Sequence, residues 1–183
     1  MMKETRNNFV KLGLALAFAL FACAFVSAQD VTSNAMPGAD FSKYHTYKWV
    51  PIEGASYPNQ IVDAQIKASI DSQLASKGLT KTDGDKADLL IGYQVSIQQE
   101  KQWNAYGTGG MRWGGGMASA QQSTISIGTL VADMYDPANK QLVWRGAVSK
   151  TLNISKDPDK NYSKLEKALA KLFRNYPPGM GKQ

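Results

Sequence analysis

The stretch from residue 87 to residue 98 constrains the fold of this chain most, because apolar and polar residues alternate along it. Its apolar positions recur at every second residue: Leu89, Ile91, Tyr93, Val95 and Ile97. Successive side chains of a strand point to opposite faces, so this pattern predicts a strand with one buried face. Such a strand is typical of a mostly antiparallel sheet that helices cover on one side.

Two amphipathic segments predict helices that can cover this face. The first spans residues 59–77, with Asn59 as its N-cap and Gly78 after its end. Its apolar residues recur at every fourth position: Val62, Ile66, Ile70 and Leu74. The second spans residues 159–176 and is ended by Pro177. Its apolar face consists of Tyr162, Leu165, Leu169, Leu172 and Tyr176.

Three further segments predict strands, at residues 44–50, 123–135 and 141–151. Residues 136–140 join the last two, and Pro137 with Asn139 predicts a hairpin turn there. The expected order is therefore β-α-β-β-β-α. We expect an α+β two-layer sandwich, in which a four-stranded, mostly antiparallel sheet carries two helices on one face. The first strand–helix–strand connection allows a parallel pair, and the strand order stays open.

The N-terminal residues have the three parts of a secretory signal. Positive charges come first, the apolar run 12–26 follows, and Val26-Ser27-Ala28 supplies small residues for cleavage. The apolar run is shorter than the roughly 20 residues that span a bilayer as a helix. We therefore expect a cleaved leader at residues 1–28, a tether at 29–40, one domain at 41–178 and a tail at 179–183. An uncleaved membrane anchor is the alternative.

Cys23 offers a second processing route, because Leu20-Phe21-Ala22-Cys23 resembles the lipidation box of bacterial lipoproteins. The apolar residues after Cys23 fit this route less well than cleavage after Ala28. Localisation is expected in the periplasm or cell envelope, with an outer-membrane lipoprotein as the alternative. Membrane association is expected only if Cys23 is lipidated.

Charge and cysteine content exclude several classes of protein. The net charge of +6 falls to +4 without the leader, and no long basic block remains, so no nucleic-acid partner is expected. Cys23 is the only cysteine, so a chain cleaved after Ala28 has no disulfide and depends on its hydrophobic core.

Several phrases, in this order and spacing, resemble a known family. They include residues 40–49 (DFSKYHTYKW), 87–93 (ADLLIGY), 128–133 (GTLVAD), 140–146 (KQLVWRG) and 173–178 (FRNYPP). The chain is similar to the bacterial domain-of-unknown-function family 4136, whose members are exported and are often lipoproteins. The resemblance covers nearly the whole mature chain and implies no activity.

The polar residues form no recognisable catalytic or metal site. His45 is the only histidine, so a zinc site is not expected. Asp83, Asp85 and Asp88 lie around a glycine but lack the closing glutamate of a calcium loop, which favours a solvated turn. Asp133 and Arg145 are expected to form a cross-strand ion pair. No cofactor is expected.

The glycine-rich segment 106–116 is the best candidate for an interaction site. It matches neither a Walker loop nor a dinucleotide fingerprint, which leaves a flexible connection or a binding loop. Aromatic and methionine side chains are costly to expose without a partner, and they gather in or beside this segment. The candidate interaction residues are Trp103, Tyr106, Met111, Arg112 and Trp113.

Two functions from different classes remain. The first is a non-enzymatic binding or scaffold module of the cell envelope, which contacts an envelope protein, a lipid or a cell-wall component through the glycine-rich loop. The second is a hydrolase or transferase that acts on an envelope polymer through carboxylates such as Asp133. The missing catalytic set favours the first.

Overall fold

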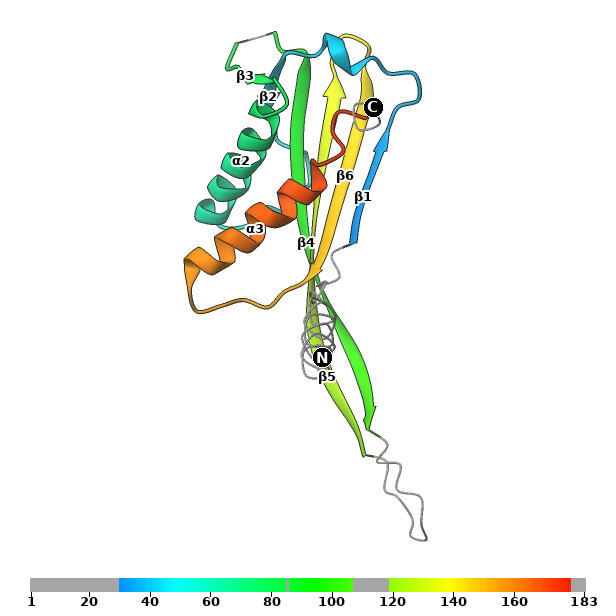
Figure 1. Ribbon diagram of the computed structural model, residues 1–183, viewed down its shortest axis with the longest axis vertical. Coiled ribbons are helices and arrows are strands. Elements are labelled where there is room, and N and C mark those ends of the chain that lie inside the picture. The colour runs from blue at the N-terminus through cyan, green and yellow to red at the C-terminus, as the bar shows by residue number, and fades with distance from the viewer. Residues whose placement is uncertain (1–29, 85, 107–118, 179–183) are drawn as a thin grey trace, which may run out of the picture.

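The computed structural model describes residues 30–84, 86–106 and 119–178. The elements, in chain order, are β1 (Asp30–Ala35), the short 3-10 helix η1 (Phe41–Lys43), β2 (Thr46–Trp49), α2 (Gln60–Ala75), β3 (Thr80–Lys81), β4 (Leu89–Tyr106), β5 (Ser119–Asp136), β6 (Gln141–Thr151) and α3 (Pro158–Leu172). Figure 1 shows that α2 and α3 lie on the same side of the sheet. The expected α+β class and the shared side of the two helices are confirmed.

The sheet is larger than expected. It has six strands in the order β1-β6-β5-β4-β2-β3, so the prediction of four strands is wrong. One added strand, β1, lies in the expected tether and pairs antiparallel with β6, with Val31 opposite Val148. The other, β3, is only two residues long and pairs parallel with β2. Because β2 also pairs parallel with β4, the sheet is mixed, as the strand–helix–strand connection allowed.

Helix α2 begins and ends through local backbone chemistry. The side-chain oxygen of Asn59 accepts a hydrogen bond from the Val62 N–H at 3.1 Å, which satisfies one free donor of the first turn. At the other end, Gly78 adopts a φ of +86°, and the Leu79 N–H donates to the Leu74 carbonyl at 3.1 Å. This left-handed glycine turns the chain away from the helix.

Helix α3 starts one residue before the expected position and ends earlier. The Asp157 side chain accepts hydrogen bonds from the Asp159 and Lys160 N–H groups, and Pro158 occupies the first turn. The helix ends at Leu172, so the prediction that it continues to Tyr176 is wrong. Tyr176 is nevertheless only 2% exposed, because the chain turns after Phe173 and returns the ring to the core.

The core lies between the helices and the sheet face beneath them. Its largest fully buried side chains are Trp144, Tyr47, Tyr93, Tyr176, Phe173, Ile70, Leu74, Leu89, Ile91, Met134, Leu169 and Leu172. The buried face of β4 follows the predicted alternation as far as Tyr93, and the partly buried Val95 still packs against the core. This face does not extend to Ile97, which is 67% exposed.

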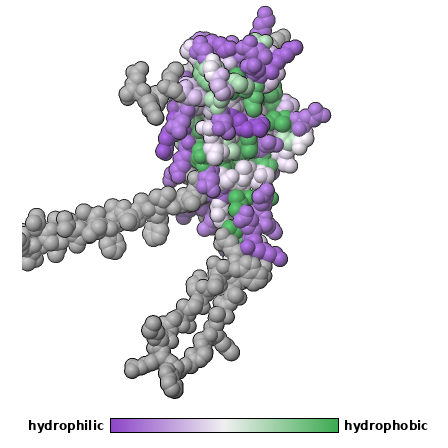
Figure 2. Space-filling view, turned by 90° about the vertical axis from the view of Figure 1, so that its right-hand side faces the viewer, coloured by the Kyte–Doolittle hydropathy of each residue, from purple (hydrophilic) through white to green (hydrophobic). Residues whose placement is uncertain are grey.

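Strands β4 and β5 extend beyond this core. They pair continuously from Leu90 opposite Tyr135 to Tyr106 opposite Ser119. Figure 1 shows the far part of this hairpin projecting beyond the helices. We call residues 97–106 and 119–128 the distal ribbon. In Figure 2, which views the molecule from the side of β1, green apolar and purple polar residues lie side by side where this ribbon begins.

Candidate functional site

The distal ribbon consists of β4 and β5 alone, whereas nearer the core each of these strands also pairs with another strand. Strand β6 accompanies β5 only as far as Thr151 opposite Ile127, followed by a hydrogen bond from the Leu152 N–H to the Ser126 carbonyl. Strand β2 accompanies β4 only as far as Trp49 opposite Ile91. Within the described residues, no further strand pairs with the outer edges of the ribbon. Beyond these points β4 and β5 pair only with each other among the described strands.

Two of the five predicted interaction residues lie in a strand. Trp103 and Tyr106 belong to β4, so their placement in a loop is wrong. The pairing of β4 with β5 continues through both positions, with Trp103 opposite Gln122. Met111, Arg112 and Trp113 lie outside the described residues, as does the predicted lipidation residue Cys23.

Asp133 forms the cross-strand ion pair expected for it. Both carboxylate oxygens accept hydrogen bonds from Arg145, at 2.6 Å to Nε and 2.7 Å to Nη2, and the two residues are direct register partners. The ion pair with Asp133 raises the pKa of Arg145 above its ordinary value. A carboxylate held on both oxygens by a guanidinium is poorly suited to act as a general acid or base.

Among the other predicted polar residues, Asp88 has a structural role, whereas Asp85 lies outside the described residues. His45 is exposed just before β2. One carboxylate oxygen of Asp88 accepts hydrogen bonds from the backbone N–H groups of His45 and Thr46 and from the Thr46 hydroxyl, which ties β2 to the start of β4. The described residues contain no cluster of histidine, cysteine, aspartate or glutamate that could hold a metal ion.

A second candidate site is an aromatic pocket that the sequence did not reveal. It lies between the chain after β2, strand β4 and the first two turns of α2, and has a volume of about 380 Å³. Its walls include Trp49, Tyr57 and Tyr93, with Gln60, Asp63 and Lys67 from α2. The only sequence signal for it was the spacing of Asp63 and Lys67, which places both on one helix face. We call it the aromatic pocket.

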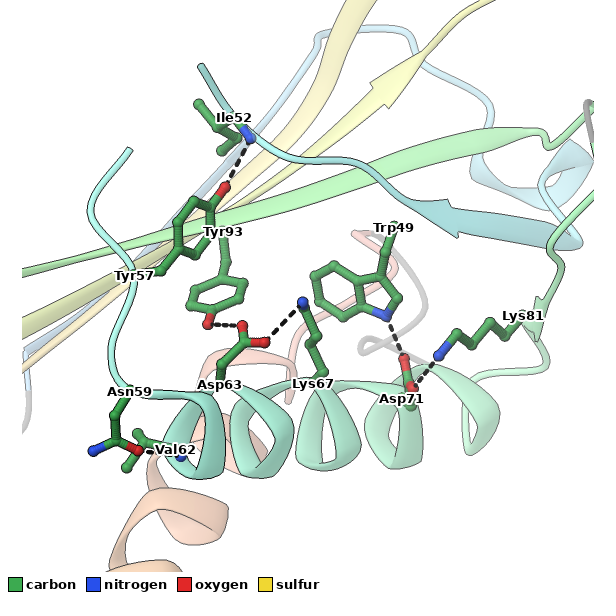
Figure 3. Close-up of polar contacts among 10 residues, drawn as sticks. All are labelled: Trp49, Ile52, Tyr57, Asn59, Val62, Asp63, Lys67, Asp71, Lys81 and Tyr93. Carbon is green, nitrogen blue, oxygen red and sulfur yellow. Dashed lines mark hydrogen bonds and ion pairs between the residues drawn. The ribbon is translucent and has the colours of Figure 1, made fainter. Parts of the chain in front are cut away.

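Hydrogen bonds fix the polar side of the aromatic pocket, as Figure 3 shows. One Asp63 oxygen accepts a hydrogen bond from the Tyr93 hydroxyl, and the other lies 2.9 Å from Lys67 Nζ. Burial alone would raise the pKa of Asp63, but the Tyr93 and Lys67 hydrogen bonds outweigh it and lower that pKa. Burial, together with Asp63, raises the pKa of Tyr93, so its hydroxyl stays protonated and donates.

The loop side of the aromatic pocket is held by Tyr57. Its hydroxyl accepts a hydrogen bond from the Ile52 N–H at 2.8 Å, and its ring packs edge-on to Tyr93 with centroids 5.3 Å apart. Trp49 packs edge-on to the same Tyr93 ring at 6.1 Å, and its indole N–H donates to Asp71 at 2.8 Å. All three rings are thus fixed by contacts within the protein.

A family model described as "Domain of unknown function (DUF4136)" matches residues 31–178. The chain belongs to this family. The resemblance seen in the sequence is thereby confirmed, and the match begins at the second residue of β1. Among curated proteins, none matches the chain. No described helix is long and apolar enough to cross a membrane.

Two solved structures share the fold. A PDZ domain protein from Parabacteroides distasonis superposes with a TM-score of 0.55 at 17% identity, over 90% of this chain. The family member described here spans only 40% of the length of that protein. A PelC dodecamer from Paraburkholderia phytofirmans superposes with a TM-score of 0.50 at 13% identity, over 80% of this chain and 95% of that one. At these identities the likeness is one of fold.

Proposed function

We propose that this chain is a non-enzymatic binding or scaffold module of the bacterial cell envelope, and that its contact surface is the distal ribbon. The observation that carries the proposal is the projection of β4 and β5 beyond the helices that cover the rest of the sheet (Figure 1). A two-stranded ribbon in water is at best marginally stable, so contact with a partner would stabilise a long one.

The exposed chemistry of the ribbon suits a partner that adds a strand. Free strand edges carry backbone donors and acceptors that another strand can satisfy, and side chains on alternate positions then provide specificity. Ile97 is 67% exposed on one face, and Ile125 and Ile127 are half-buried on the other. These features favour a protein partner over a lipid or a cell-wall polymer.

Assembly from several copies is compatible with this fold. The PelC structure of the same fold is a dodecamer. We therefore include a second copy of this chain among the protein partners to be tested. Binding rather than catalysis is further supported by Asp133, since Arg145 occupies both of its oxygens.

We expect Ile97→Lys to weaken association with isolated cell envelopes by about tenfold or more. The substitution places a charge at an exposed position of the ribbon, where lysine opposes edge-to-edge pairing. Co-sedimentation of the purified mature protein with envelopes measures the association. Light scattering after gel filtration measures self-assembly of the same samples, and protein-free lipid vesicles test for lipid binding.

The matched control is Ile154→Lys, because Ile154 is 78% exposed and lies in the connection between β6 and α3. It should leave association within about twofold of wild type, as expected for a surface substitution outside the interface. Equal loss in both variants, or unchanged association of Ile97→Lys, would contradict the ribbon as the contact surface. Binding to the lipid vesicles alone would contradict a protein partner.

We also propose that the chain is exported. Support comes from the positive start, the apolar run and the small residues at Val26 and Ala28. Mass spectrometry of protein recovered from the native envelope should find Gln29 as the first residue, or a lipidated Cys23 if the second route is used. Recovery of the full-length, unmodified chain from the cytoplasm alone would overturn export, whereas its recovery from the envelope would indicate the uncleaved anchor.

A further inference from the structure

The aromatic pocket has walls that suit stacking against a ligand. Trp49 and Tyr57 both stand nearly perpendicular to Tyr93, at 84° and 85°, so they flank one buried ring. Tyr57 is 40% exposed and Trp49 is half-buried, whereas Tyr93 is only 1% exposed. Two rings of the wall are thus in reach of solvent and are held in place by their contacts with the third. An apolar ligand face can pack on them without reordering the site.

The polar groups of the aromatic pocket combine donors with acceptors and carry no net charge. Lys67 has three N–H donors, its side chain is 39% exposed, and the ion pair with Asp63 accounts for one of these donors. Each Asp63 oxygen retains a second lone pair beyond the hydrogen bond it already accepts. Gln60, which is exposed at the rim, adds an amide that both donates and accepts.

We propose that the aromatic pocket binds a neutral saccharide unit. A pyranose ring offers a face of C–H groups to an aromatic ring, and its hydroxyls donate and accept at once. The pocket presents both surfaces within about 380 Å³, which falls in the usual range for small-ligand sites of about 300–1,000 Å³.

Other ligand classes fit this chemistry less well. The charges of Asp63 and Lys67 lie 2.9 Å apart. Asp63 would therefore repel a free anion, and Lys67 would repel a cation. A proline-rich peptide could stack on the rings, but its prolines have no N–H groups to offer the carboxylate. The aromatic pocket shares no residue with the distal ribbon, so this proposal does not depend on the proposed function.

The test is a titration of the mature protein with N,N′-diacetylchitobiose and with cellobiose, followed by nitrogen–proton NMR. We expect the Trp49 indole N–H signal and the backbone signals of Tyr57, Gln60 and Lys67 to shift together and to saturate in the millimolar range. The Trp49 signal is identified by its loss in Trp49→Phe. Inorganic phosphate and a decaproline peptide are titrated in the same way.

Lys67→Met should weaken saccharide binding by about tenfold, because it removes the donors but keeps an apolar side chain of similar length. The matched control is Lys81→Met. Lys81 is also a partly exposed lysine paired with an α2 aspartate, Asp71, at 3.2 Å, but it lies outside the aromatic pocket. It should leave the affinity within about twofold.

Two variants of Tyr57 distinguish the role of its ring, which would stack on the saccharide, from the role of its hydroxyl, which holds the loop at Ile52. Tyr57→Leu removes the ring and should lower the affinity by about tenfold, whereas Tyr57→Phe keeps the ring, removes only the hydroxyl that accepts from the Ile52 N–H, and should lower the affinity less. The proposal is overturned if neither saccharide shifts these signals, if phosphate or decaproline binds instead, or if Lys81→Met weakens binding as much as Lys67→Met. Retained binding in Tyr57→Leu would also overturn it.

Discussion

Replacing Trp144 with alanine should lower the free energy of unfolding by about 3–5 kcal/mol, the range for a large aromatic side chain truncated in a core. Trp144 is 1% exposed. It stacks on Phe173 with ring centroids 5.2 Å apart and packs edge-on to Tyr176 at 5.4 Å. Its removal therefore opens a cavity where β6 meets the chain that follows α3, and urea unfolding followed by circular dichroism measures the loss.

Leu142→Ala is the control for this prediction, because Leu142 lies in the same strand but is 37% exposed. Its truncation should cost about 1 kcal/mol or less, since little apolar surface leaves a packed environment. If Trp144→Ala unfolds at the same urea concentration as wild type, the packing of the C-terminal segment on β6 is wrong.

The same tryptophan explains why a glycine is needed two residues later. A Cβ atom at Gly146 would lie 2.7 Å from Trp144 Cζ2 and 2.8 Å from Leu172 Cδ1. The sequence shows Lys140–Gly146 as one phrase, but the requirement for glycine follows from the packing of the Trp144 ring and of Leu172 over this position. Local patterns thus locate β6, while the fit of side chains across layers depends on the whole fold.

Periodicity predicted the elements that bury one continuous face. The stripe through Ile66, Ile70 and Leu74 located α2, and strand β6 has the predicted bounds, residues 141–151. Asn139, which helped to predict the turn before β6, is not its left-handed residue, because Lys140 has the φ of +54°. The Asn139 amide instead donates to Asp136.

Periodicity could not predict elements whose pairing is long-range. In β1 only Val31 and Ala35 pack against the core, and the other positions are exposed, so the segment has the composition of a tether. Pairing with β6, far along the chain, makes it a strand. In the distal ribbon, residues 98–101 are polar and exposed, so no apolar alternation marks the continuation of β4.

The aromatic pocket was hidden for a related reason. Its residues come from β2, the loop after it, α2 and β4, and the path of the loop decides where Tyr57 lies. Sequence spacing could have indicated only the Asp63–Lys67 pair on one helix face. The prediction of interaction residues in or beside the glycine-rich segment depended on composition alone. Composition does not determine where a strand ends.

Asp136→Ala should lower the free energy of unfolding at neutral pH by about 3–5 kcal/mol, as expected when one partner of a buried charged network is removed. Asp136 is 2% exposed at the start of the β5–β6 turn. Its oxygens accept hydrogen bonds from the Tyr44 hydroxyl at 2.8 Å, from Lys43 at 3.0 Å and from the Ala138 and Asn139 backbone N–H groups. Without the carboxylate, these donors lose their acceptor.

The pH dependence of this contribution has a definite sign. Burial alone would raise the pKa of Asp136, but the hydrogen bonds from Asn139, Lys43 and Tyr44 outweigh it and hold that pKa well below the ordinary aspartate value of 3.8. A folded-state pKa below the unfolded value means that the contribution is complete above the unfolded pKa and is lost as the pH falls toward the folded pKa. The difference in stability between wild type and Asp136→Asn should therefore narrow below about pH 4.

Urea unfolding at a series of pH values, for wild type, Asp136→Ala and Asp136→Asn, tests both statements. The control is Asp133→Asn, because Asp133 pairs with the half-exposed Arg145 on the sheet surface. Asp133→Asn should lower the free energy of unfolding by only about 0–1 kcal/mol, the usual range for a surface ion pair. If Asp136→Ala lowers the free energy of unfolding no more than Asp133→Asn does, the buried network does not hold the β5–β6 turn to η1. A gap between wild type and Asp136→Asn that widens as the pH falls would instead show that the folded-state pKa of Asp136 lies above its unfolded value.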